Sequence, residues 1–478
     1  MLAGILLLVA WGALVFGAVY PWAYIPLFAA ATVIGCLAYW RGSGAGPLPI
    51  GTKGAIALLV IVAFGALLQI VPVPSNVRLK VSPATESFLQ QVDVAYAAAA
   101  MAREHDIDNQ MASTPDGRPL SINPESTGRG LLMLAALIVF LTGTVKLFGK
   151  VGTLEVTRGV IALGVLLAII GIVQKALLGD HAYAGMKIYG FWEPRYKLTT
   201  PFGPFVNKNH YAGWMVMALP LAMGYLLAVA TIWLRRVRPG WRHRLLALSS
   251  PEGARLQLLA FAIVLMGVAL ALTMSRSGIA CFILASVIAA FTGAKGAGSL
   301  GARAGLAALL LALVATAFAW ADVDVFRRFA SGSESVRMRR EAWRDAAAIV
   351  RDFPLVGTGL NTYGTATLKY KTARTDLHFQ EAHNDYLQLA AEGGLLLGVP
   401  AVLALGCCGW AIRRRFLEER YGSMSYWLRV GATTGLLAIA LQSIVEFSRQ
   451  LPGNAALCTT LCAAALSRSH AATHRASV

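Results

Sequence analysis

The chain has few charged residues for its length. Only 14% of its 478 residues are Asp, Glu, Lys or Arg, whereas 57% are hydrophobic. Soluble globular domains have about 25% charged and about 45–50% apolar residues, so this composition excludes an ordinary soluble protein. It predicts an all-α membrane protein that crosses the bilayer many times.

Cysteine and clustered metal ligands are also scarce. The six cysteines all fall in apolar runs, where cysteine behaves as a small hydrophobic residue, at positions 36, 281, 407, 408, 458 and 462. This placement excludes a disulfide framework in the polar segments. Those segments also lack a group of His, Asp and Glu at metal-ligand spacing, so we expect no metal and no other cofactor.

Long hydrophobic runs, in contrast, recur along the whole chain. A helix needs about 20 apolar residues to cross about 30 Å of hydrocarbon. Suitable runs predict about 12 transmembrane helices, near residues 2–20, 22–40, 54–72, 130–148, 157–178, 210–233, 257–274, 278–292, 304–321, 389–412, 427–446 and 453–467. The first run has no charged n-region and is followed at once by the second, so we expect a retained helix and not a cleaved signal peptide.

The short loops predict the orientation, because Lys and Arg concentrate on the cytoplasmic side of a membrane. With both termini inside, the cytoplasmic loops contain Lys146, Lys150, Arg235, Arg236, Arg238, Arg242, Arg244, Arg413, Arg414 and Arg415. Residues 1–321 then hold membrane helices 1 to 9, with outer loops at 73–129 and 179–209. Residues 322–388 form a long outer loop, and residues 389–478 hold helices 10 to 12 and a short cytoplasmic tail.

Acidic residues are too few to balance the basic ones. The chain has 42 Lys and Arg against 24 Asp and Glu, a formal net charge of +18. Anionic lipid headgroups account for the cytoplasmic share of this excess, but ten basic residues lie between Arg327 and Arg374 in the long outer loop. Nucleic acid is a poor partner outside a cell, so a lipid-linked phosphate or diphosphate is the better candidate. A solvated basic helix is the alternative.

The long outer loop contains a predicted amphipathic helix, which starts at Ser333 or Ser335 and ends at Asp352, just before Pro354. We expect it to lie along the outer membrane surface. Its apolar face should hold Val336, Trp343, Ala347 and Val350, with Arg337, Arg340, Arg344 and Arg351 on a neighbouring face. Arg339 falls on the apolar face and therefore needs a buried anion or carboxylate.

The motif from His383 to Gln388 opens the predicted span 389–412. Polar side chains at the mouth of a span are expensive and usually functional. The alternative is that His383 or Asn384 only caps the helix that follows. Upstream, Gly357-x-Gly359 is a weak phosphate signal by itself, and we interpret it as a turn that reverses the chain toward His383.

Two further polar sites lie at the outer ends of predicted spans. Arg276 lies between Ser275 and Ser277 in a very short connection, where a helix N-terminus would help it to bind an anion. Asn209 and His210 open the sixth span. Asn209 is either a helix cap or a functional residue, and His210 either an interfacial or a functional one.

Together, these motifs resemble the O-antigen ligase and polymerase (Wzy-type) superfamily. The resemblance rests on Ser275-Arg-Ser-Gly, Arg339-x-x-x-Trp343, Pro354-x-x-Gly-x-Gly359, His383-Asn-Asp-Tyr-Leu-Gln and Glu392-Gly-Gly-x-x-x-Gly398 in this order. It implies a GT-C-like glycosyltransferase of the bacterial inner membrane, with its active site facing the periplasm. Such enzymes move an oligosaccharide from undecaprenyl diphosphate to an acceptor hydroxyl, without a metal.

The resemblance also implies roles for individual residues. Arg276 and Arg339 would bind the donor diphosphate, and His383 would be the general base. Apart from the resemblance, the positions of further polar residues make Asn209, His210, Arg337, Asn384, Asp385 and Glu392 candidates for a supporting role, with Asp385 or Glu392 as candidates for orienting His383. These roles suit the chemistry, because guanidinium groups match phosphate oxygens and imidazole accepts a proton near neutral pH.

Alternative functions remain open at this point. A transporter or flippase of an anionic glycolipid would share the spans and basic patches, but it should place polar residues deep in several helices. Within the enzyme class, a ligase would transfer the glycan to lipid A-core. Residues 16–24 resemble proteins of exopolysaccharide assembly, which favours a polymerase of O-antigen or exopolysaccharide repeat units.

Overall fold

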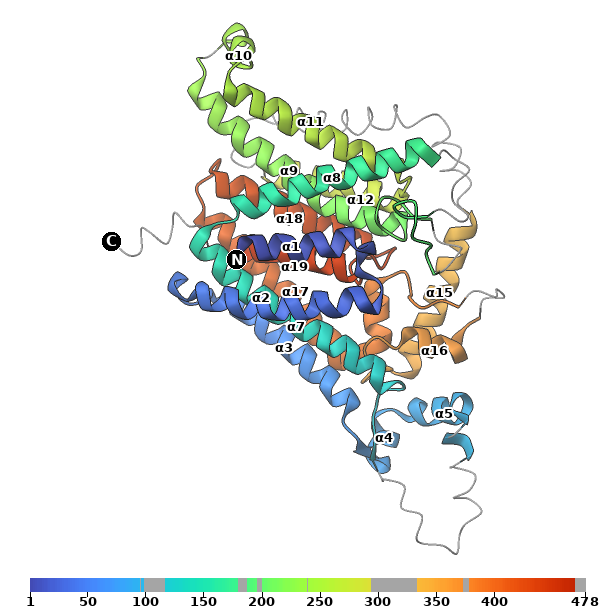
Figure 1. The fold of residues 1–478 in the computed structure, drawn as a ribbon. Coiled ribbons are helices and arrows are strands. Elements are labelled where there is room, and N and C mark those ends of the chain that lie inside the picture. The colour runs from blue at the N-terminus through green and yellow to red at the C-terminus, as the bar shows by residue number, and fades with distance from the viewer. Residues whose placement is uncertain are drawn as a thin grey trace, which may run out of the picture.

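The structure, a computed structural model, describes residues 1–94, 96–98, 117–178, 187–195, 200–238, 240–293, 333–372 and 378–468. Its helices form a membrane bundle with a smaller group of helices at one end (Figure 1). The bundle contains α1 (Leu2–Leu14), α2 (Pro21–Arg41), α3 (Ile50–Ile70), α7 (Pro124–Val151), α8 (Leu154–Leu178), α9 (Lys208–Arg236), α11 (Pro251–Leu272), α12 (Arg276–Gly293), α17 (Asp385–Glu418), α18 (Met424–Gln442) and α19 (Pro452–Leu466).

The all-α membrane class is confirmed. Within the described residues, seven helices are long and apolar enough to cross a membrane, and three shorter apolar helices accompany them. Every predicted run other than 304–321 overlaps a helix of the bundle. Residues 304–321 lie outside the described part of the chain, so the count of twelve spans and the GT-C-like architecture stay predictions.

Small residues allow the helices of the bundle to approach one another closely. A Cβ atom at Gly143 of α7 would lie 1.9 Å from the carbonyl oxygen of Gly35 in α2, and one at Gly224 of α9 would lie 2.4 Å from the carbonyl oxygen of Trp427 in α18. Helices in lipid associate through such close contacts, because lipid chains are as apolar as leucine. Large side chains, among them Trp214 and Phe140, fill the remaining core.

The smaller group of helices forms a separate, packed cap. It contains α4 (Ser75–Val81), α5 (Pro83–Val92), the short antiparallel strands β1 (Val73–Pro74) and β2 (Gly117–Arg118), α15 (Ser333–Asp352) and α16 (Tyr363–Tyr370). Its own hydrophobic core includes Phe88, Ile349, Phe353 and Tyr363 and reaches the start of α17 at Ala391. Two short helical turns, η1 (Phe16–Ala18) and η2 (Ser43–Ala45), and α10 (Trp241–Ala247) complete the described elements.

Helix α15 begins and ends where the sequence predicts, but its buried face differs from the prediction. Ala342, Ala346 and Ile349 are fully buried, whereas Ala347 is exposed. The prediction gave weight to the larger residues Trp343 and Val350, but a stripe of alanines allows closer packing on α16 and α17. Arg339 lies at the edge of this buried stripe, with 24% of its side chain exposed.

The turn after α15 fixes the cap to the bundle. Gly357 and Gly359 both have positive φ, and the amides of Thr358 and Gly359 donate to the carbonyl oxygens of Ala391 and Glu392 in α17. Gln69 at the end of α3 donates to the carbonyl oxygens of Val356 and Glu392 at 2.6 and 2.9 Å. These buried bonds join the cap to α3 and α17 at the end of the bundle where His383 lies.

Candidate active site

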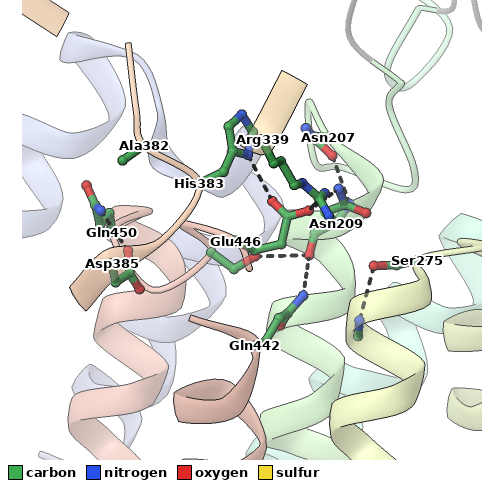
Figure 2. Close-up of polar contacts among 12 residues, drawn as sticks. Asn207, Asn209, Ser275, Arg339, Ala382, His383, Asp385, Gln442, Glu446 and Gln450 are labelled. Carbon is green, nitrogen blue, oxygen red and sulfur yellow. Dashed lines mark hydrogen bonds and ion pairs between the residues drawn. The ribbon is translucent and has the colours of Figure 1, made fainter. Parts of the chain in front are cut away.

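A buried carboxylate, Glu446, lies at the centre of the candidate site (Figure 2). The prediction placed residue 446 at the end of a span, but α18 ends at Gln442 and Glu446 belongs to the loop before α19. Its Oε1 accepts a hydrogen bond from Asn209 Nδ2 at 2.7 Å and pairs with the guanidinium of Arg339. Arg339 therefore has the carboxylate partner that its place on the helix required.

His383 contacts the other oxygen of the same carboxylate. Its Nδ1 lies 3.4 Å from Glu446 Oε2, and its ring packs edge-to-face on Phe447 with a centroid distance of 4.9 Å. The backbone of His383 is left-handed, with φ 51°, a conformation that costs a non-glycine residue about 1–2 kcal/mol. The strained backbone thus occurs at the residue whose imidazole faces Glu446.

The capping role belongs to the next residue. Asn384 is the N-cap of α17, and its side chain accepts from the amides of Tyr386 and Leu387 at 3.1 and 3.0 Å. The alternative that His383 caps this helix is therefore wrong, and the imidazole is left for Glu446 and Phe447.

Charges around Glu446 keep it ionised. Burial alone would raise the pKa of this carboxyl, but the hydrogen bond with His383 and the positive charge of Arg339 hold the pKa below its usual value. A buried anion that is paired and hydrogen-bonded avoids most of the cost of leaving water. Glu446 is thus a fixed negative charge between a guanidinium and an imidazole.

The start of α9 supplies the other side of the site. Asn207, not Asn209, caps this helix, because its side chain accepts from the amide of Asn209 at 2.8 Å. The side chain of Asn209 is thereby free of capping and reaches Glu446. His210 is buried, and its ring packs edge-to-face on Phe447 with a centroid distance of 4.7 Å, so Phe447 contacts both histidines.

Asp385 and Glu392 do not orient His383. Asp385 accepts from Gln450 Nε2 at 2.7 Å and lies 3.5 Å from Arg449, which ties the start of α17 to the loop that carries Glu446. Glu392 accepts from the amides of Asn361 and Tyr363 at 2.7 and 3.0 Å, so it holds the cap. The prediction that Asp385 or Glu392 orients His383 is therefore wrong, and Glu446 is the carboxylate that contacts its imidazole.

Arg276 is the first residue of α12, at the same end of the bundle. Ser275 beside it is buried and accepts from the amide of Gly278, and a Cβ atom at Gly278 would lie 2.8 Å from Ala212 of α9. This close contact places the N-terminus of α12 one turn from Asn209 and His210. Arg337, in contrast, is 69% exposed and lies 3.9 Å from Glu341 on its own helix, so the structure does not bring it to the site.

Glu446 is the residue that the sequence analysis missed. A charged residue at the end of an apolar run can indicate a functional site. The predicted span 427–446 included Glu446 because the residues before it are largely apolar. Among the described residues, no three His, Cys, Asp or Glu side chains are grouped so that they could hold a metal ion.

The fold and the site define a multi-pass membrane protein with a polar, charged centre at one end of its helices. Residues 261–402 match the family model described as O-Antigen ligase. This match confirms the resemblance to proteins of the O-antigen ligase and polymerase type, and it indicates glycan transfer in a membrane setting. The matched residues include Arg276, Arg339 and His383, whereas Glu446 lies beyond them. No curated protein matches the chain.

Proposed function

We propose that this protein transfers an oligosaccharide from undecaprenyl diphosphate to an acceptor hydroxyl at the outer leaflet of the bacterial inner membrane. We propose further that it acts as a polymerase of O-antigen or exopolysaccharide repeat units. The observation that carries the proposal is the grouping of Arg339, His383 and Asn209 around buried Glu446. The family match supports the same class of reaction.

In the proposed reaction, the acceptor oxygen attacks the anomeric carbon as the bond from that carbon to the diphosphate oxygen breaks. His383 Nε2 takes the proton of the acceptor hydroxyl, while Nδ1–H donates to Glu446. The carboxylate stabilises the imidazolium that forms, and general base catalysis of this kind contributes about 10² to 10⁴ in rate. The hydrogen bond with Glu446 also fixes the direction of the ring.

The leaving diphosphate gains negative charge as the bond breaks, so fixed cations lower the barrier. Arg339 uses one nitrogen for Glu446, and a guanidinium has further N–H donors for phosphate oxygens. Arg276 adds a second guanidinium at the N-terminus of α12, where the helix dipole favours an anion. We propose no metal in this reaction.

The positions of the basic residues support the proposed orientation of the protein. Helix α9 begins near the site and ends at Arg235 and Arg236, and α17 begins near the site and carries Arg413, Arg414 and Arg415 toward its other end. Basic loops stay on the cytoplasmic side, so we place the site in the periplasm and both termini in the cytoplasm.

The test is glycan transfer by purified protein in nanodiscs, with an undecaprenyl diphosphate-linked oligosaccharide as donor and EDTA in the buffer. Wild-type protein should elongate the lipid-linked glycan without another acceptor. Glu446→Gln should lose about 10²-fold or more in rate, because the amide keeps the contact with Asn209 but cannot balance the imidazolium. Glu125→Gln, at a carboxylate that is 84% exposed, should leave the rate unchanged.

The same assay separates polymerase from ligase. Transfer that requires added lipid A-core would assign the ligase role and overturn the polymerase proposal. An absence of transfer to any acceptor, or full activity in Glu446→Gln, would overturn the proposed chemistry.

A further inference from the structure

Six aromatic residues from two distant segments form a cluster at the end of the bundle, which we name the aromatic platform. Its members are Phe16, Tyr20, Trp22, Tyr189, Phe191 and Trp192. Phe16 stacks on Trp192 with a centroid distance of 4.7 Å, and two further stacked pairs, Tyr20 with Trp22 and Tyr189 with Phe191, each have a centroid distance of 6.1 Å. These distances are typical of attractive ring pairs, so the rings form one continuous surface.

Much of this surface faces outward. Trp22 is 48% exposed, Tyr189 40% and Phe191 71%. Three polar ring atoms are engaged within the protein, because Tyr189 Oη donates to the carbonyl oxygen of Leu14 at 2.6 Å and Trp192 Nε1 donates to Tyr20 Oη at 3.3 Å. The platform therefore presents mainly ring surface to a ligand.

The backbone under the platform is held in an unusual conformation. Phe16, Gly17 and Ala18 have successive φ values of 58°, 71° and 55°, and Tyr189 has φ 58°. Two backbone hydrogen bonds between Ile188 and Trp192 close the turn that carries Tyr189 and Phe191. Strained conformations persist where the surroundings fix them, often at ligand sites, and a fixed ring surface binds with little loss of entropy.

The platform adjoins the candidate active site. The junction of α1 and α2 lies at the same end of the bundle as α15 and α16 (Figure 1). A Cβ atom at Gly17 would lie 3.1 Å from the ring of Phe205 and 3.3 Å from the side chain of Leu451. Leu451 ends the loop that carries Glu446, and Phe205 lies shortly before Asn209, so Gly17, next to Phe16 of the platform, packs against both backbone segments that build the site.

From this arrangement we infer that the aromatic platform binds the glycan chain of the substrate by stacking on the apolar faces of its pyranose rings. This inference rests on the proposed function, which makes a glycan the substrate of the adjoining site. Lys187 and Glu193, paired at 3.3 Å and largely exposed, flank the turn and offer charged partners for sugar hydroxyls. A surface that holds the glycan chain is expected to lie beside the reacting groups and not among them, as the aromatic platform does.

The competing occupant is the membrane interface, where tryptophan and tyrosine are enriched. Interfacial rings point their polar atoms toward the headgroups, whereas the hydroxyl of Tyr189 and the indole nitrogen of Trp192 bond to the protein. The ion pair of Lys187 and Glu193 also suits water better than acyl chains. These features favour a glycan.

A binding measurement tests the inference without turnover. Full-length protein in nanodiscs is run in native gels cast with increasing concentrations of the water-soluble polysaccharide that mild acid releases from the glycolipids of the source cells. Trp22→Ala and Phe191→Ala should each weaken retention by roughly three- to tenfold, as expected for the loss of one stacked ring, and Trp22→Phe should weaken it less. Size-exclusion profiles show that each variant is folded.

Trp40→Ala is the matched control, because Trp40 lies at the other end of α2 and is 70% exposed. It should bind the polysaccharide like the wild type. Unchanged retention in the double variant W22A/F191A, equal loss in Trp40→Ala, or no retention of the wild type would overturn the inference and leave the rings to the membrane interface.

A failure of the proposed function gives a different result. His383→Asn should bind the polysaccharide like the wild type, while its transfer rate falls by about 10²-fold or more. If the wild type binds the polysaccharide in a Trp22-dependent manner but never transfers a glycan, the inference about the aromatic platform is supported and the proposed reaction is wrong.

Discussion

At the scale of single residues, Glu446 connects groups that the sequence keeps far apart. The sequence shows that Arg339 needs an anionic partner, because an arginine on the buried face of a helix cannot remain unpaired. It does not show which carboxylate serves, since Glu446 lies 107 residues away and pairing over that distance depends on the packing of α15 against the bundle. The sequence also indicates His383 as a functional residue. The prediction that Asp385 or Glu392 orients its imidazole is wrong, because Glu446 is the carboxylate that it contacts.

The two arginines give a prediction at this scale. Arg276→Ala and Arg339→Ala should lose nearly all transfer because the leaving diphosphate loses a fixed cation, and lysine should restore little because it lacks the bidentate fork. Arg340→Ala, an exposed neighbour on the same helix, should stay active. Transfer rates and protein levels in the membrane check this, and wild-type activity in either of the first two variants removes that arginine from the mechanism.

Glu381 gives a second prediction, about pH. Burial raises its pKa to about 8, although the amide of Gln388 partly lowers it. The folded protein therefore holds a proton that the unfolded chain releases, so this contribution to stability is complete below about pH 4.5 and is lost as the pH rises through about 8. Thermal unfolding in detergent from about pH 5 to about pH 9 should show this fall.

Glu381→Gln should make that fall in stability smaller, because a neutral amide has no proton to lose. If the variant keeps the same slope of melting temperature against pH as the wild type, the protonation of Glu381 is not its origin.

At the scale of elements, the apolar runs predict the helices well because a span must satisfy its own backbone in lipid. The limits of α15 also follow from its flanking residues. Two features cannot be predicted from the sequence. One is the buried face of α15, which close packing of alanines decides, and the other is the end of α18 at Gln442, because Ile444 and Val445 extend the apolar run as far as Glu446. Both depend on neighbours that are distant in the chain.

The turn between α15 and α16 gives a prediction for elements. A Cβ atom at Gly357 would lie 2.2 Å from backbone atoms of Glu392, at a positive φ of 68°. Gly357→Ala should therefore cost about 2 kcal/mol of stability or more and loosen the cap from α17. Differential scanning of detergent-solubilised protein measures the change.

Gly398→Ala is its control on α17, because nothing lies within 4 Å of the added atom. Alanine within a helix should be neutral or stabilising by about 0.5–1 kcal/mol. Equal effects of the two substitutions would show that the turn is not the junction between cap and bundle.

At the scale of the whole molecule, composition is enough to predict a polytopic membrane protein, but not the cap. The cap brings residues 75–94, 96–98, 117–123, 333–372 and the start of α17 around one hydrophobic core. No periodicity in any one of these segments indicates the others. From the sequence, these segments are predicted as separate outer loops. In the structure they pack together and position Arg339 and His383.

Membrane orientation gives the prediction at this scale. In a variant without the native cysteines, Arg344→Cys on α15 should react with a membrane-impermeant maleimide in intact spheroplasts, and Ser249→Cys after α10 should react only after detergent is added. Both positions are exposed, so their difference reports the side of the membrane. Reaction of Ser249→Cys alone in intact cells would invert the proposed orientation and place the site in the cytoplasm.

The most direct test of the central claim is the transfer rate of His383→Asn, measured with the lipid-linked donor beside donor binding. Asparagine tolerates the left-handed backbone of this position and keeps a hydrogen-bonding side chain, but it cannot take a proton from the acceptor. The account predicts a loss of about 10²-fold or more in rate, as in His383→Ala and His383→Gln, with donor binding retained. Robust turnover by His383→Asn would contradict the assignment of His383 as the general base.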